Sequence, residues 1–116
     1  MNEQQAVAQF RGAAIAKHDY VSIPRSFTTH REMADAQRFL LDLGLSGTSA
    51  LRSLLRDPSP SVRFEAAAVL VGRGDETAAP VLVALAQEAG LIGVESQHFL
   101  EDWDRMHGKH TDDPDA

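Results

Sequence analysis

The sequence contains no cysteine, which excludes disulfide bonds, thiolate catalysis and zinc or iron–sulfur sites with Cys ligands. No apolar run approaches the roughly 18 residues that a membrane-spanning helix needs. No N-terminal segment joins basic residues to an apolar core of signal-peptide length. We therefore expect a cytoplasmic protein with no membrane segment.

Positive charge is also scarce. The chain has 17 Asp and Glu residues against 11 Lys and Arg residues, and its net charge is −6. The cationic side chains are scattered among acids and form no block. Because a phosphate backbone repels an acidic chain, this balance disfavours nucleic acid as a partner. It favours a basic protein, since opposite charge steers two proteins together.

What the sequence does have is an ordinary globular composition, with 43% hydrophobic and 24% charged residues in 116 positions. Alanine dominates the apolar set, and no alternating run supports a strand, so we expect an all-α fold. We predict one domain over residues 1–107, with an irregular connector at 18–28 where Pro24 interrupts the helical period. Residues 108–116 lack apolar content and are predicted to form a disordered acidic tail.

The most informative stretch runs from Leu51 to Asp75. It indicates two antiparallel helices around an Asp-Pro-Ser-Pro turn, the first over residues 48–56 and the second capped by Ser59 with Pro60 at its first position. The second helix is apolar on two sides, so neighbouring helices must cover both. Its two predicted stripes are Val62, Ala66, Val69 and Leu70, and Phe64, Ala67, Ala68 and Val71.

Four further helices are predicted around this pair. The first spans residues 3–17, and the second starts at a capping box of Thr29 and Glu32 and stops at Gly44. The fifth is capped by Asp75 or Thr77, has Pro80 in its first turn, and stops at Gly90. The sixth follows Gly90. The inward residues of these last two helices are expected to be Ala78, Leu82, Leu85, Ala86 and Ala89, then Ile92, Ser96, Phe99, Trp103 and Met106. The result is about six helices in antiparallel hairpins.

The central stretch resembles a HEAT repeat, which implies a short HEAT-like, armadillo-type α-solenoid. The matching residues are Asp57, Pro58, Val62, Arg63, Ala66, Ala67, Leu70, Gly74 and Asp75. The resemblance implies that Asp57 and Arg63 form a structural polar pair. Over roughly residues 6–107 the chain is also similar to a small bacterial family of unknown function with this fold, through Leu54, Leu55, Arg56, Asp57, Pro58, Pro60, Val62, Arg63, Leu100 and Trp103. That likeness implies no activity.

No residue pattern indicates catalysis. His98 with Asp102, and Asp104 with His107, each share a helical face, but the two pairs do not converge on one metal ion. The sequence His18-Asp19-Tyr20 lies near Ser22 and Ser26, although a Ser/His/Asp triad usually draws on separate loops. We therefore expect no catalytic, cofactor-binding or metal-binding residue, and no enzyme activity.

A tentative interaction surface is assigned instead to Tyr20, Phe27, Arg31 and Arg38. The two arginines could belong to a DNA-binding face with Arg11 and Arg25, but Glu32 and Asp35 interrupt that set. Trp103 repeats with Phe99 and Met106 at helical spacing, so we interpret it as structural, packing the last helix onto the fifth. The alternative is a binding hot spot, where tryptophan is enriched.

These observations favour a non-catalytic protein-interaction module of unknown partner, of a bacterial immunity or adaptor type, acting as a monomer or homodimer. One alternative is a homo-oligomeric structural protein, in which the apolar flanks of a short stack bury one another. A second alternative is an unrecognised enzyme or ligand-binding protein that uses the connector at 18–28.

Overall fold

The computed structural model describes residues 1–18 and 27–106, without the side chains of residues 27 and 28. Over these ranges the chain is all-α and holds no strand, so the predicted fold class is confirmed. The α-helices are α1 (Glu3–Lys17), α2 (Phe27–Asp42), α3 (Leu45–Ser53), α4 (Pro60–Gly72), α5 (Ala79–Ala86) and α6 (Leu91–Met106), with 3-10 turns η1 (Leu54–Arg56) and η2 (Glu76–Ala78).

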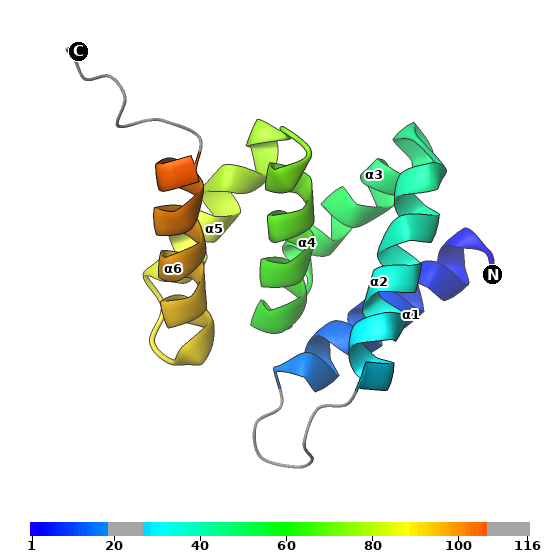
Figure 1. The fold of residues 1–116 in the computed structure, drawn as a ribbon, viewed down its shortest axis with the longest axis horizontal. Coiled ribbons are helices and arrows are strands. Elements are labelled where there is room, and N and C mark those ends of the chain that lie inside the picture. The colour runs from blue at the N-terminus through cyan, green and yellow to red at the C-terminus, as the bar shows by residue number, and fades with distance from the viewer. Residues whose placement is uncertain (19–26, 107–116) are drawn as a thin grey trace.

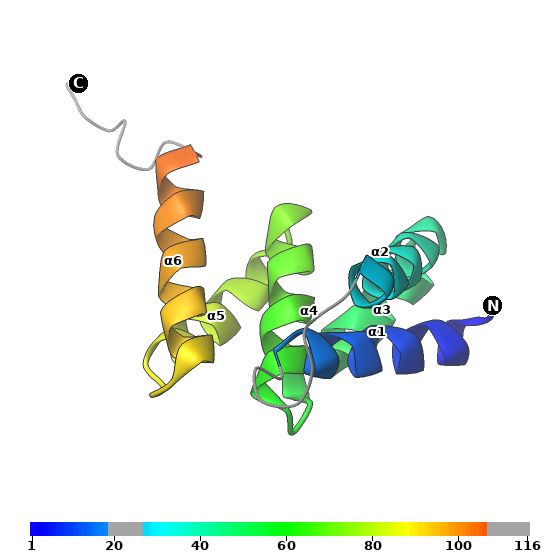
Figure 2. The same cartoon turned by 60° about the horizontal axis from the view of Figure 1, so that its bottom comes forward.

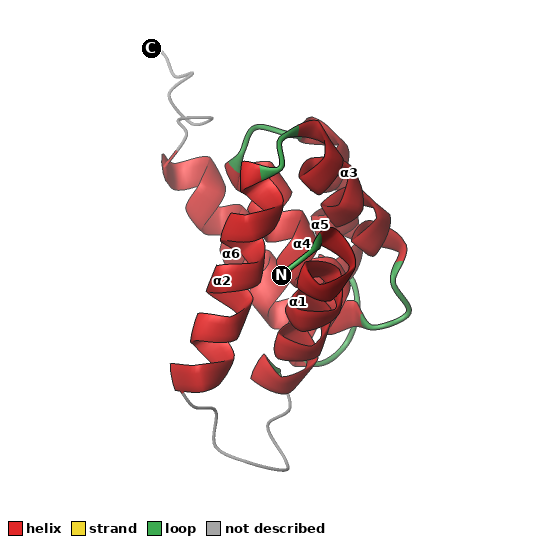
Figure 3. Ribbon diagram, turned by 90° about the vertical axis from the view of Figure 1, so that its right-hand side faces the viewer, coloured by secondary structure: helices red, strands yellow, loops and turns green. Residues whose placement is uncertain are grey.

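The helices form two layers. Helices α2, α4 and α6 lie side by side and run in the same direction, while α1, α3 and α5 cross behind them (Figure 1). Turning the molecule shows the same separation, with the tilted α1, α3 and α5 joining one upright helix to the next (Figure 2). A view from the end of the stack places α2 and α6 on one side and α1 on the other (Figure 3). This is the arrangement of stacked helical hairpins.

Helix α4 is the centre of the core, because it contacts helices of both neighbouring pairs. Its two predicted apolar stripes are confirmed. Most residues of each stripe are buried, and Val69 is partly buried and packs against the core. The core contributed by α4 and its neighbours includes Phe10, Leu40, Leu51, Val62, Phe64, Ala66, Ala67, Leu70, Val71, Leu82 and Leu85. As predicted from the sequence, neighbouring helices cover both apolar sides of α4.

Helix α1 spans the predicted residues 3–17, whereas the N-terminus of α2 differs from expectation. Helix α1 starts with a capping box in which Gln5 N donates to Asn2 Oδ1 at 2.8 Å and Asn2 N donates to Gln5 Oε1 at 2.9 Å, a signal that we missed. The capping box predicted at Thr29 is wrong, because α2 already begins at Phe27. Proline fixes its own φ and disfavours helical φ and ψ angles in the residue before it. It does not restrict the residues that follow, so a helix can begin soon after Pro24.

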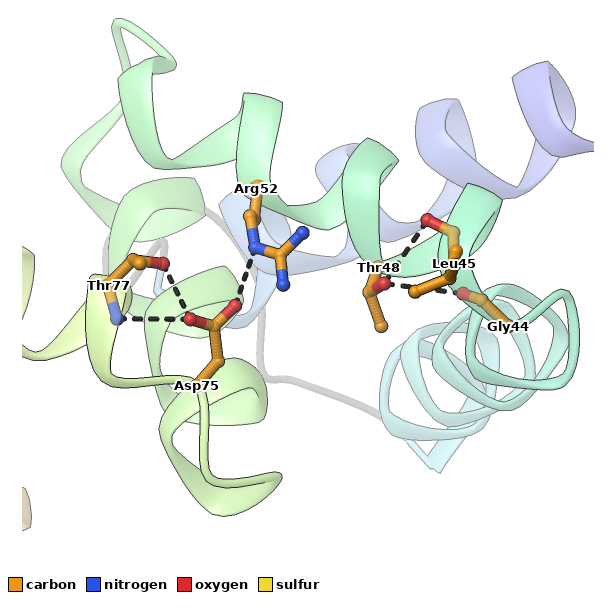
Figure 4. A network of polar contacts seen from close by, with 6 residues as sticks. All are labelled: Gly44, Leu45, Thr48, Arg52, Asp75 and Thr77. Carbon is orange, nitrogen blue, oxygen red and sulfur yellow. Dashed lines mark hydrogen bonds and ion pairs between the residues drawn. The ribbon is translucent and has the colours of Figure 1, made fainter.

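Helix α3 begins at Leu45 rather than at Thr48. Gly44 has a φ of 71°, the left-handed conformation expected of a helix-stopping glycine. It lies between the end of α2 and the start of α3, which begins at the next residue. The Thr48 hydroxyl donates to the carbonyl oxygens of Gly44 and Leu45, at 3.3 and 3.2 Å (Figure 4). Thr48 therefore stabilises the first turn of α3 from within.

Ser59 and Pro60 occupy the predicted first positions of α4, but the Ser59 side chain makes no capping hydrogen bond. The backbone amide of Ser59 instead donates to Asp57 Oδ2 at 2.9 Å. Asp75 is the cap of η2, as one of the two predicted alternatives, and its Oδ1 accepts from Thr77 N at 3.0 Å. An aspartate thus organises the turn on each side of α4.

Helix α5 and the inward stripe of α6 are both shorter than predicted. Helix α5 ends at Ala86, and Ala89 is exposed instead of belonging to the inward stripe. Gly90, with a φ of 97°, directly precedes α6 rather than ending α5. Met106 is 75% exposed, so its predicted inward position is wrong. Ser96, one of the predicted inward residues, is fully buried, and Phe99 and Trp103 pack partly buried against the core.

Candidate protein-binding face

Three of the four residues that we assigned to an interaction surface, Phe27, Arg31 and Arg38, belong to α2. Arg31 and Arg38 are exposed on α2, and seven residues of separation place them on one side of that helix. Tyr20 lies outside the described residues, and so does the side chain of Phe27. The structure therefore places two of the four.

Arg38 faces the C-terminal end of α4. It lines a hollow of about 300 Å³ together with Arg73, which is the C-cap residue of α4. We call this the arginine hollow; its lining is Ala34, Gln37, Arg38, Leu41, Asp42 and Arg73. Sequence reasoning missed Arg73, because its place in a Gly-Arg-Gly turn gave no sign of which neighbouring helix it would meet.

The two arginines of this hollow differ from those arginines of the described residues that are paired with carboxylates. Arg11, Arg52, Arg63 and Arg105 each lie within 4.0 Å of a carboxylate. Within residues 1–18 and 27–106, Arg38 and Arg73 are exposed and neither forms such an ion pair. Their guanidinium groups therefore keep hydrogen-bonding capacity for an outside ligand.

A second hollow lies on the other side of the end of α4, toward α6. It measures about 170 Å³, and we call it the tryptophan hollow; its lining is Val71, Gly74, Asp75, Glu76, Ala79 and Trp103. Trp103 is half-buried and stacks on Phe99 with ring centroids 6.2 Å apart. Phe99 meets Phe64 edge-on at 6.3 Å. Trp103 thus packs against the core at one side and lines a surface hollow at the other.

Asp75 lines the tryptophan hollow and is held in place by hydrogen bonds. Its Oδ2 accepts a hydrogen bond from Arg52 Nε at 2.6 Å, and its Oδ1 accepts one from the Thr77 hydroxyl at 2.6 Å (Figure 4). The hydrogen bonds from Thr77 and the nearby charge of Arg52 outweigh partial burial and hold the pKa of Asp75 below its ordinary 3.8. Arg52 on α3 is thereby tied to the turn that follows α4.

The polar pair implied between Asp57 and Arg63 has a different form. Arg11 on α1 donates to Asp57 through Nε at 2.6 Å and through Nη2 at 3.2 Å. Burial raises the pKa of Asp57, but hydrogen bonds from Arg11 and Ser59 and the charges of Arg11 and Arg63 outweigh it, so that this pKa lies below 3.8. Arg63 acts on Asp57 by charge, and its Nη1 lies 3.9 Å from Glu88 Oε2.

A buried charge cluster joins three helices at the other end of this face. Glu65 on α4 is 6% exposed, and its Oε2 lies 2.6 Å from His18 Nε2 and 3.1 Å from Lys17 Nζ at the end of α1. His18 Nδ1 lies 3.4 Å from Glu95 Oε1 on α6. His18 therefore brings a carboxylate of α4 and a carboxylate of α6 to the end of α1. We call these four residues the His18 cluster.

The ionised form of Glu65 is favoured in this cluster. Burial raises the pKa of Glu65, but the hydrogen bond from His18 and the charge and hydrogen bond of Lys17 outweigh it, so the pKa lies below the ordinary 4.5. The sequence pattern around His18 did not indicate this site, because the partners of His18 lie on distant helices. The available signal was Glu65 itself, a charged residue in a helix whose two sides are both apolar.

In the described part of the chain, no group of three His, Cys, Asp or Glu side chains is arranged to hold a metal ion. Among the same residues, no helix is both long enough and apolar enough to cross a membrane. The described residues form two surface hollows, one lined by Arg38 and Arg73 and the other by Asp75 and Trp103. Such side chains can bind another protein by hydrogen bonds and packing.

Comparison with known proteins gives one match. The model of the HEAT-repeat family matches residues 34–91, which span α3, α4 and α5 together with most of α2. No curated protein and no solved structure matches the chain. The matched segment covers half of the sequence and includes the Asp57–Asp75 region on which the resemblance was based. With its stacked helical hairpins and its central α4, this chain belongs to the HEAT-repeat family.

Proposed function

We propose that the protein is a non-catalytic protein-interaction module, and that its partner lies across the C-terminal ends of α2, α4 and α6. HEAT repeats are generally protein-interaction modules. The observation that carries the proposal is the pair of hollows on either side of the end of α4. One contains two arginines that pair with no carboxylate of the described residues, and the other contains Trp103. Tryptophan and arginine are the residues most enriched where interfaces concentrate their binding energy.

The charge of α6 suggests that part of the partner is basic. Glu101, Asp102 and Asp104 are exposed on this helix, and Asp102 pairs with Arg105. Opposite charge across an interface speeds association and selects the orientation of the partner. An immunity or adaptor-type role is the specific form of this proposal, and a gene for a basic toxin or effector beside this one would support it.

Site-specific photocrosslinking tests the proposal. A photoreactive amino acid is placed at Ala34 in the arginine hollow, at Glu76 in the tryptophan hollow, and at exposed Ser49 on the opposite layer as a control. We expect one and the same protein to be captured from host lysate at Ala34 and Glu76 but not at Ser49. Equal capture at Ser49, or capture of nothing at Ala34 and Glu76, contradicts the proposal.

Self-association is a second candidate, favoured by one observation. The outer side of α5 presents Pro80, Val83 and Ala84 around a hollow of about 640 Å³ whose lining is mostly apolar, and Val83 is 51% exposed. Terminal helices of repeat proteins normally have a polar outer face. The enzyme alternative depends on the connector, most of which lies outside the described residues.

A further inference from the structure

We propose that the arginine hollow binds an acidic segment of the partner protein, with the carboxylates of one or two Asp or Glu side chains held between Arg38 and Arg73. This inference rests on the proposed function and names the chemistry of one part of the interface. Helices α2 and α4 belong to successive hairpins, so the site exists only when the hairpins are stacked as they are here (Figure 1).

The charge of the hollow is positive in a chain that is acidic overall. Its lining has two guanidinium groups and one carboxylate, that of Asp42. Asp42 forms no ion pair within 4.0 Å in the described residues, so neither arginine is neutralised by direct contact. A carboxylate entering between Arg38 and Arg73 gains attraction that the chain itself does not supply.

The hydrogen-bonding groups match a carboxylate. A guanidinium group presents a planar fork of N–H donors that fits the two oxygens of a carboxylate. Gln37 adds an amide at the same rim, while Ala34 and Leu41 give an apolar wall suited to the methylene groups of a Glu side chain. At about 300 Å³ the hollow lies at the small limit for ligand sites, which suits one or two side chains better than a cofactor.

The same charges argue against nucleic acid as the occupant. A duplex presents many phosphates along its length, and tight binding needs several cations in a row. Here two arginines stand beside Asp42, on a protein of net charge −6. A short acidic peptide segment needs only the two cations that are present.

Fluorescence anisotropy with a short, labelled, Glu-rich peptide at low salt tests the inference on the whole chain. We expect Arg38→Gln and Arg73→Gln each to raise the Kd about three- to tenfold, as expected for loss of one charge-assisted hydrogen-bonding group. The matched control is Arg56→Gln, an exposed arginine in η1, before α4, which also forms no ion pair in the described range. It should change the Kd by no more than about twofold.

Equal weakening by Arg56→Gln, or unchanged binding in the Arg38→Gln/Arg73→Gln double variant, would show that attraction is not localised and would overturn the inference. Absence of peptide binding at the lowest salt would overturn it too, as would a DNA duplex that binds more tightly than the peptide. Unchanged melting temperatures confirm that the variants fold. Photocrosslinking from Ala34 and Glu76 does not depend on these results, so the proposed function can survive the loss of this inference.

Discussion

At the scale of single residues, Glu65 is the charge most dependent on its surroundings. It is buried in α4 and satisfied by His18 and Lys17 from the end of α1. A buried carboxylate without such partners would be costly, so its ionised state and the docking of α1 on α4 support each other. Glu65 is therefore a structural contact between the first hairpin and the rest of the stack.

The variant Glu65→Gln should lower the free energy of unfolding by about 1–3 kcal/mol, because it removes a charge-assisted hydrogen bond and leaves His18 buried with a weaker acceptor. Urea denaturation with an unchanged m-value measures this loss. The control is Glu101→Gln on the exposed side of α6, which should change stability by less than about 0.5 kcal/mol. Equal stability of the two variants would contradict the role given to Glu65.

Stability should also fall on acidification. The folded-state pKa values of Glu65, Asp57 and Asp75 lie below their ordinary values of 4.5, 3.8 and 3.8. The unfolded chain then binds more protons than the folded one between the two pKa values, so the stabilisation is present above the ordinary values and is lost as pH falls through the folded ones. Urea unfolding measured at a series of pH values from about 6 to about 3 should show this decline.

Glu65→Gln should make this decline shallower, since the substituted side chain does not titrate. Glu101→Gln replaces an exposed side chain of α6 and should retain the wild-type decline. If Glu65→Gln loses stability with pH as steeply as the wild-type protein, the depressed pKa of Glu65 does not contribute.

At the scale of helices, the closest packing depends on glycine. Gly47 in α3 is buried, and a Cβ built there would lie 1.5 Å from the Leu40 carbonyl oxygen of α2. Gly93 in α6 is similar, with Glu88 O at 1.9 Å. Both obstacles are backbone atoms, so any side chain would force the backbone segments apart. The short connection from α2 to α3 requires this contact.

Gly47→Ala should therefore destabilise the protein by at least about 1–3 kcal/mol, the usual cost of overpacking, although alanine is the better helix former. Gly12→Ala is a matched control: this glycine also lies within a helix, but a Cβ there meets nothing within 4 Å. It should gain about 0.5–1 kcal/mol. Thermal unfolding of both variants measures the difference, and a gain in Gly47→Ala would contradict the close approach of α2 and α3.

At the scale of the whole molecule, α4 has helices on both sides, whereas α5 has an uncovered outer side. The exposed stripe of Pro80, Val83 and Ala84 follows from the end of the stack, since a repeat contacts only its neighbours.

If self-association uses this stripe, Val83→Glu should reduce it, because the substitution places a charge in the apolar contact. Sedimentation equilibrium over rising protein concentration should then show association of the wild-type chain and a monomeric variant. Leu45→Glu provides the control, because Leu45 is 85% exposed at the start of α3, away from α5. A wild-type chain that remains monomeric, or equal effects of both substitutions, would exclude this interface.

Sequence patterns of short range determined the all-α class, the order of the helices and the central position of α4. Apolar residues at helical spacing identify buried stripes, and Asp75 and Pro60 mark helix starts through contacts with their own neighbours in sequence. Errors occurred where a boundary depends on distant packing. Met106 fits the periodicity of α6 but extends beyond the helices that could cover it.

The candidate sites were decided by the tertiary structure. Arg38 and Arg73 are 35 positions apart in sequence, and only the parallel stacking of α2 and α4 brings them to one hollow. His18 likewise meets Glu65 and Glu95 because three helices converge there. Side-chain periodicity reports which face of a helix is buried, but it does not specify which helix lies opposite. That choice follows from the angles and spacing at which the hairpins pack.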